Sequence, residues 1–249
     1  MNLLLLAGAG VLAGAVNGVV GSGTLLTYPM LLAAGLPPVV ANGTNSVGLA
    51  PGNAMAAWLY RDELAGRGAL VRVLAATAAV GALIGAALVL ALPASVFERV
   101  VPWLIVLACV LVVAQPRIGR ALTARGLDPA TFPRRALVPV VLVVGVYAGY
   151  FGAAQGILLM AVLATLYDVS LQRSNAVKNV LQGAANAAAA IVFIVAGVVS
   201  WPAALALGAG SLVGGSVGAP LARRLPDAVL RGVIVAVGLD AAGVSIARG

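Results

Sequence analysis

The sequence predicts an all-helical polytopic membrane protein that forms a single integral domain, 1–249. Of its 249 residues, 62% are hydrophobic and only 9% are charged, whereas about a quarter of the residues in a soluble domain are charged. Long apolar runs alternate with short breaks that carry arginine, and a spanning helix needs about 20 mostly apolar residues. A chain with so little polar surface is suited to a lipid bilayer.

Apolar runs bounded by glycine, proline and charged residues predict the helices. The predicted segments are 3–20, 23–35, 39–60, 73–92, 100–115, 136–152, 156–167, 175–197, 202–221 and 232–247. The first is expected to be a retained helix, because it lacks the basic start of a signal peptide and recurs later in the chain. Segments 23–35 and 156–167 reach only about 18 to 20 Å, short of a bilayer core of about 30 Å. These two are expected to be half-helices or re-entrant arms.

The positions of the basic residues predict how the short segments run. In one model, segment 3–20 forms a hairpin with 23–35, and segment 136–152 forms a hairpin with 156–167. This model places 13 of the 15 Lys and Arg residues on one side of the membrane. Only Arg99 and Arg248 then fall on the other side. Two continuous crossings would instead divide the cations 9 to 6. Because cytoplasmic loops carry the Lys and Arg excess, the hairpin model is preferred, with both termini outside and the linker cytoplasmic.

The sequence contains an internal repeat. When the sequence is aligned with itself so that Gly23 matches Gly156, Asn42 matches Asn175 and Asn53 matches Asn186. It predicts a first repeat, 1–115, a basic linker, 116–135, and a second repeat, 136–249. Each repeat would be a broken or re-entrant hairpin followed by three transmembrane helices. Five segments per repeat is an odd number, so the second repeat would be inverted, as in many secondary transporters.

The helix after each hairpin carries a polar stripe. In the second half its members follow the i, i+4, i+7 spacing of one helix face: Asn175, Asn179, Gln182 and Asn186. Asn42, Ser46 and Asn53 repeat this face in the first half, beside Asn45. Lipid offers these groups no hydrogen-bond partner, so they must face protein or a water-filled cavity. A substrate-binding lining and hydrogen bonding between helices both remain open.

Two ionisable residues fall inside apolar segments. Lys178, the only lysine, lies among the polar residues of 175–197 and is expected either to attract an anion or to reach the interface as a topology anchor. Asp240 lies well inside 232–247. It is a candidate for proton coupling, against the alternative of a hydrogen bond to a neighbouring helix.

The break before each short helix is the other candidate site. Gly21, Ser22, Gly23 and Thr24 open the first short helix, and Gln155 and Gly156 open the second. A helix start offers free backbone N–H groups to an anion. The alternative is that the glycines serve close helix packing in the membrane.

The composition also excludes several functions. The chain has no His and a single Cys, Cys109, so it lacks a Ser-His-Asp triad and a transition-metal site. No glycine-rich loop ending in Lys and Ser or Thr is present to bind ATP. The net charge is +8, and nearly all of the Lys and Arg residues fall in breaks between apolar segments, which argues against nucleic-acid binding. We therefore expect no enzyme activity, no cofactor and no metal.

Finally, the sequence resembles the sulfite exporter TauE/SafE family over essentially the whole chain, through its repeated plan, its basic central linker and a motif in the first half. The resemblance rests on Ala13-Gly14-Ala15-Val16-Asn17-Gly18-Val19-Val20-Gly21-Ser22-Gly23, on Leu25-Leu26-Thr27-Tyr28-Pro29, and on Leu36-Pro37-Pro38 with Ala41-Asn42-Gly43-Thr44-Asn45. The second half has Gly152-Ala153-Ala154-Gln155-Gly156 where the family has a denser glycine cluster. The resemblance implies transport of sulfite, sulfoacetate or related organic anions, usually outward across the bacterial inner membrane.

Together these observations predict a secondary transporter for a small anion, working by alternating access between the two halves. An anion channel and a non-transporting membrane scaffold subunit are the alternatives. The expected partners are the small anion and the lipid bilayer, and a homo-oligomer is left open. Basic residues on the cytoplasmic side would gather anions there, which favours export.

Overall fold

The computed structural model describes residues 2–124, 134–167 and 170–222, and over these ranges the chain is helical with no β-strand. The helices, with two short 3-10 turns η1 and η2, are α1 (Leu3–Val19), α2 (Thr24–Ala33), α3 (Pro38–Leu59), η1 (Arg61–Leu64), α4 (Gly68–Ala91), α5 (Ala94–Ala124), η2 (Arg134–Ala136), α6 (Leu137–Tyr150), α7 (Gln155–Leu166), α8 (Leu171–Val195) and α9 (Trp201–Ala222). The all-helical fold is thus confirmed. The predicted segment 232–247, with Asp240, lies outside the described residues.

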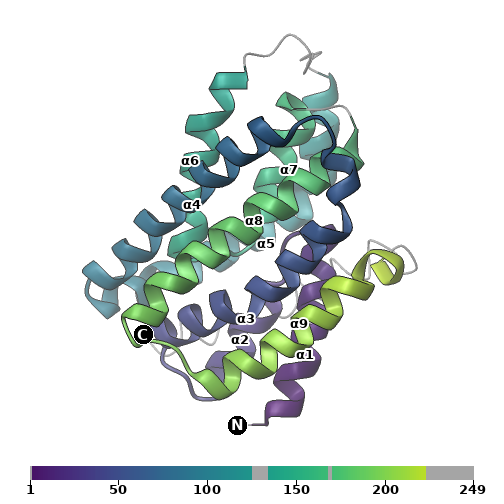
Figure 1. The fold of residues 1–249 in the computed structure, drawn as a ribbon. Coiled ribbons are helices and arrows are strands. Elements are labelled where there is room, and N and C mark those ends of the chain that lie inside the picture. The colour runs from purple at the N-terminus through teal and green to yellow at the C-terminus, as the bar shows by residue number, and fades with distance from the viewer. Residues whose placement is uncertain (1, 125–133, 168–169, 223–249) are drawn as a thin grey trace.

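The helices form a bundle in which α3 and α8 lie side by side in the middle (Figure 1). On one flank α9 packs along both α1 and α3, and on the other flank α4 packs along both α6 and α8. Glycines permit this closeness: a Cβ added to Gly10 would lie 2.5 Å from the Leu207 oxygen, and one added to Gly81 would lie 2.5 Å from the Leu142 oxygen. Small residues at helix interfaces are the usual device of membrane bundles.

The outer surface of the bundle is suited to lipid. Three helices in the described part are long and apolar enough to span a membrane: Gly68–Ala91, Ala94–Ala114 and Gln172–Val195. Large apolar side chains point outward, including Trp103 at 67% exposed and Val195 at 83% exposed, while Lys178 and most of the described Asn and Gln side chains are buried. An apolar exterior around a polar interior is the reverse of a soluble domain, in which exposed surface carries the charges.

The two short helices predicted from the sequence are present. α2 has 10 residues and α7 has 12. A Cβ added to Gly23 would lie 2.5 Å from the backbone oxygen of Ala13, although residues ten apart in one continuous helix are separated by about 15 Å. The chain therefore reverses between α1 and α2, and α7 likewise packs back against α6.

Each reversal contains a residue in the left-handed region. Gly21 has φ 80° just before α2, and Ala154 has φ 58° just before α7. These two positions are equivalent in the sequence repeat, under the shift that aligns Gly23 with Gly156. A side chain disfavours this conformation by about 1 to 2 kcal/mol, and Ala154 is the only non-glycine residue with positive φ in the described part. The second break therefore has a left-handed residue at the same repeat position as the first, and it has another at Gly152, with φ 73°.

One predicted segment was too short. The apolar segment 100–115 was expected to be a helix, but α5 runs from Ala94 to Ala124, and η2 begins at Arg134. The linker bounds, 116–135, stay a prediction. Arginine, alanine and leucine, which are frequent in this stretch, are strong helix formers. Basic residues are expected where a chain leaves the apolar layer of a membrane, which is a different property from where its helix ends.

Candidate functional site

The two breaks meet inside the bundle. The backbone N–H of Gly156 donates a hydrogen bond of 3.0 Å to the backbone oxygen of Gly21, and a Cβ added to either glycine would collide with the backbone of the other. Ser22 and Gln155 lie next to these glycines in the chain, and each is at most 1% exposed. The structure thus joins the two predicted glycine breaks into one buried centre.

Hydrogen bonds inside the first break use several predicted site residues. Asn45 donates from Nδ2 to the Thr24 hydroxyl at 3.1 Å, and its Oδ1 accepts from the Thr27 hydroxyl. The backbone N–H of Gly23 donates to Asn17 Oδ1 at 2.6 Å. Asn45 therefore holds α2 against α3, and Asn17 holds the start of α2 against α1.

The asparagines that begin the two polar stripes reach across to the opposite half. Asn42 on α3 donates from Nδ2 to the backbone oxygen of Tyr150, at the end of α6, at 3.0 Å. Asn175 on α8 donates to the backbone oxygen of Gly18, near the end of α1, at 3.1 Å. The last carbonyls of a helix lack partners within it, so each asparagine satisfies one at a break. Ser46 donates within its own helix, to the Asn42 oxygen at 3.0 Å.

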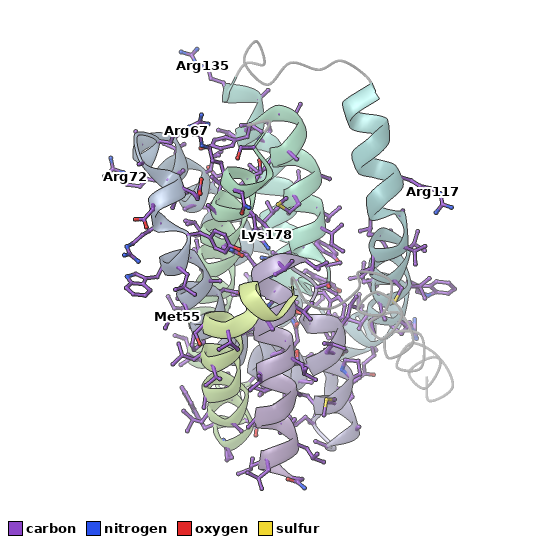
Figure 2. All side chains as sticks on the ribbon, turned by 90° about the vertical axis from the view of Figure 1, so that its right-hand side faces the viewer. Met55, Arg67, Arg72, Arg117, Arg135 and Lys178 are labelled. Carbon is purple, nitrogen blue, oxygen red and sulfur yellow. The ribbon has the colours of Figure 1, made fainter. Side chains whose placement is uncertain are left out.

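Lys178 lies about midway along the bundle, whereas Arg67, Arg72 and Arg135 lie toward one end (Figure 2). It is completely buried, and it is the only buried charged residue in the described ranges. Its Nζ donates to the backbone oxygen of Asn17 at 2.8 Å. No carboxylate of the described residues forms an ion pair with it. Its cost of burial is offset instead by oxygen dipoles at the end of α1.

Other predicted site residues carry buried polar atoms with no hydrogen-bond partner among the described protein groups. These atoms are Ser22 Oγ, Asn53 Nδ2, both side-chain polar atoms of Gln155, and Gln182 Oε1. Gln182 Oε1 is 3.0 Å from the Cβ position of Gly156, and Gly183 beside it approaches Asn53. Because buried polar groups are nearly always paired, this group is the best placed to bind a polar ligand.

Of the remaining predicted residues, Asn179 donates from Nδ2 to the Gly18 oxygen at 3.3 Å, and Asn186 is 8% exposed on the same face of α8. Two contributors were missed by sequence reasoning. Asn17 could have been found as a polar residue within an apolar run four positions before the Gly21 break. Ser211 on α9, which donates to the Gly48 oxygen at 2.6 Å and accepts from the Gly52 N–H at 3.2 Å, gave no signal in the sequence.

The arrangement can hydrogen-bond a small polar molecule and attract a negative charge. The described part of the chain contains no cluster of His, Cys, Asp and Glu that could hold a metal ion. The available chemistry is thus that of amides, one hydroxyl, backbone groups and one ammonium. Such groups bind and orient a ligand.

Comparisons with known proteins agree with this character. A model of the family described as sulfite exporter TauE/SafE matches residues 6–246. The chain is 28% identical to the probable membrane transporter protein ORF9 of Sinorhizobium sp, over 93% of this chain and 87% of the relative. It is 29% identical to the probable membrane transporter protein YfcA of Escherichia coli K12, over 91% of this chain and 82% of the relative. No solved structure matches it.

Proposed function

This chain belongs to the sulfite exporter TauE/SafE family, and we propose that it is a secondary transporter of a small anion. The proposed substrates are sulfite, sulfoacetate or a related organic anion, exported across the bacterial inner membrane. The observation that carries the proposal is the meeting of two helix breaks beside buried polar atoms that lack partners among the described residues. Broken helices that meet within a bundle are where secondary transporters bind their substrates.

The proposed ligand-binding group consists of Ser22, Asn53 and Gln155, with Gln182 beside them. The amide nitrogens of Asn53 and Gln155 would donate to the oxygens of the anion, and the Ser22 hydroxyl can donate as well. Lys178 supplies the nearby positive charge, from the same face of α8 as Gln182. Thr24, Asn42 and Asn45 would act by holding the breaks in position, because their amide or hydroxyl groups already pair within the protein.

Alternating access requires two halves that can move against each other, and we propose that they form an inverted repeat. The shift that aligns Gly23 with Gly156 exchanges α1 with α6, α3 with α8 and α4 with α9. Under this exchange the packing of α1 on α9 becomes that of α6 on α4, and the packing of α3 on α9 becomes that of α8 on α4. The paired left-handed residues Gly21 and Ala154 also support the repeat.

The orientation in the membrane follows from the same model. Arg67, Arg72, Arg117 and Arg135 lie in the upper part of Figure 2, away from the start of α1. We propose that this end faces the cytoplasm, because cytoplasmic ends carry the basic residues. In a Cys109→Ala background, Asn2→Cys should react with an impermeant maleimide on intact spheroplasts, and Arg135→Cys only after lysis. The opposite labelling would reverse the topology.

Transport is tested by counterflow in proteoliposomes with labelled sulfite and a panel of small sulfonates. We expect saturable exchange in the wild type and at least a tenfold loss in Gln155→Ala, since a buried hydrogen bond from an amide nitrogen to a charged ligand contributes about 1.5 to 3 kcal/mol. Gln172→Ala is the matched control, because Gln172 is also a glutamine but is exposed. Its exchange should equal that of the wild type.

Other outcomes would redirect the proposal. Conductance without counterflow would indicate an anion channel with the same lining. Absence of exchange for every anion, together with no anion-dependent rise in Tm, would favour a scaffold subunit, because a ligand that binds the folded state stabilises it. Equal exchange by Gln155→Ala and Gln172→Ala would remove the proposed binding group.

A further inference from the structure

Two amide side chains on α8 are paired at one end only. The Nδ2 atoms of Asn175 and Asn179 both donate to the backbone oxygen of Gly18, at 3.1 and 3.3 Å. Because a backbone carbonyl only accepts hydrogen bonds, the amide atoms that face it must be the nitrogens. The Oδ1 atoms are thereby identified, and both are buried with no donor among the described protein groups. This face of α8 therefore presents two buried acceptors that no described group uses.

The nearest cation in the sequence does not pair with these oxygens. Lys178 lies between the two asparagines in the chain, but its Nζ donates to the backbone oxygen of Asn17, at 2.8 Å. Gln155 adds a third acceptor, because both of its side-chain polar atoms are buried and unpaired in the described part of the chain. Either orientation of that amide leaves one oxygen and one nitrogen available. Since buried polar groups are nearly always paired, these oxygens require donors from outside the protein.

Unpaired donors are present beside the same helix break. Asn17 Oδ1 accepts from the Gly23 N–H at 2.6 Å, which identifies the other amide atom of Asn17 as nitrogen. This Nδ2 is buried with no acceptor among the described groups, as is Asn53 Nδ2. An oxyanion accepts hydrogen bonds from such donors, but it offers nothing to an acceptor oxygen. A ligand whose polar atoms only accept would therefore leave the acceptors of α8 unpaired.

We propose that the ligand is a small organic anion that carries a hydroxyl group, and that this hydroxyl donates to Asn179 Oδ1, with Asn175 Oδ1 as a neighbouring acceptor. That this ligand is the transported substrate rests on the proposed function. A neutral donor fits this face of α8 better than an ammonium, because Lys178 already places a positive charge on the helix and like charges repel. Asn179 lies one helical turn from Gln182, whose Oε1 is 3.0 Å from the Cβ position of Gly156. The acceptor is therefore close to the meeting point of the two breaks.

Ligand binding to the purified protein in detergent tests this assignment, because a ligand of the folded state raises the Tm. The matched probes are 2-hydroxyethanesulfonate and propane-1-sulfonate, which differ by a hydroxyl in place of a methyl group. The concentration needed for a given rise in Tm should be at least tenfold lower for the hydroxylated probe, since a site that hydrogen-bonds a hydroxyl rejects an analogue without one. 2-Aminoethanesulfonate should bind more weakly than the hydroxylated probe. Equal binding of the first two probes, no rise in Tm with either, or tighter binding of the amine would overturn the proposal.

Asn179→Leu removes the acceptor, while Asn175 still donates to the Gly18 oxygen, and its preference for the hydroxylated probe should disappear. Asn42→Leu is the matched control, because Asn42 makes the corresponding amide bond to the Tyr150 oxygen, at 3.0 Å, and should keep the wild-type preference. An unchanged preference in Asn179→Leu would overturn the assignment of the acceptor. Should that variant not accumulate, the three probes on the wild type decide. A clear preference in binding without counterflow would count against the transport proposal alone.

Discussion

The contact between Gly21 and Gly156 can be tested by adding one methyl group. Gly21→Ala adds a Cβ that would collide with the Gly156 backbone, at a residue with φ +80°. Gly35→Ala is a control that isolates the backbone effect, because Gly35 has φ +89° and nothing lies within 4 Å of its Cβ position. Both variants incur the left-handed strain of a side chain, but only Gly21→Ala also pushes the two breaks apart.

The magnitudes separate the two variants clearly. Left-handed strain costs about 1 to 2 kcal/mol for each. Overpacking against a backbone, which cannot rotate away, adds about 1 to 3 kcal/mol for Gly21→Ala. Loss of the Gly156 to Gly21 hydrogen bond adds about 1 kcal/mol. The free energy of unfolding should therefore fall by about 2 to 4 kcal/mol more in Gly21→Ala than in Gly35→Ala.

The assay is unfolding in detergent followed by the fluorescence of the tryptophans, with counterflow measured in parallel. Gly21→Ala should unfold at clearly lower temperature or denaturant concentration than Gly35→Ala and should lose exchange, while Gly35→Ala should retain exchange. Equal stability and equal exchange in the two variants would show that the Gly21 contact with Gly156 is not close in the functional protein. That result would refute the joined-break site.

Three further predictions concern packing and hydrogen bonding. Ser211→Ala removes the hydroxyl that bridges two backbone groups of α3 and should lower the free energy of unfolding by about 1 to 3 kcal/mol. The control Ser216→Ala removes an exposed hydroxyl and should change the free energy of unfolding by less than about 0.5 kcal/mol. Equal losses in the two variants would contradict the bridge. Asn42→Ala leaves the last carbonyl of α6 without its donor and should cost about 1 to 3 kcal/mol in denaturant unfolding; a neutral result would show that water replaces the amide. Gly85→Ala should be destabilising because its Cβ would meet the backbone of α6. Gly8→Ala has open space around its Cβ position and should be neutral or stabilising by up to about 1 kcal/mol. The reverse order of the two Tm values would disprove the close α4–α6 packing.

Much of the fold was predictable because the bilayer restricts the choices. Backbone polar groups in lipid must be paired within a helix or closed barrel, so long apolar runs were sufficient to predict helices. The short helices α2 and α7 were predictable from length, and glycine marked the breaks before them. The end of α5 was not predictable from the sequence. Basic residues are typical of a chain that has reached water, but they do not end a helix.

The candidate site was predicted as a set of residues but not as a set of roles. The stripe spacing correctly placed Asn175, Lys178, Asn179 and Gln182 on one buried face of α8. Spacing could not distinguish an amide that holds a helix end from one that is left to bind a ligand, because this depends on atoms more than a hundred positions away in the chain. Asn42 and Asn175, which look equivalent to Gln182 in sequence, already donate to carbonyls of the opposite half.

The sequence by itself determined that this protein is a helical membrane bundle, and it predicted two similar halves, because hydropathy, charge placement and repetition are properties of residues read in order. Only the tertiary structure decided that the breaks at Gly21 and Gly156 touch, and that the Lys178 ammonium donates a hydrogen bond to a backbone carbonyl of α1. The physical reason is that a hydrogen bond is set by the positions of two atoms, and the packing of α8 against α1 brings together groups that no local pattern relates.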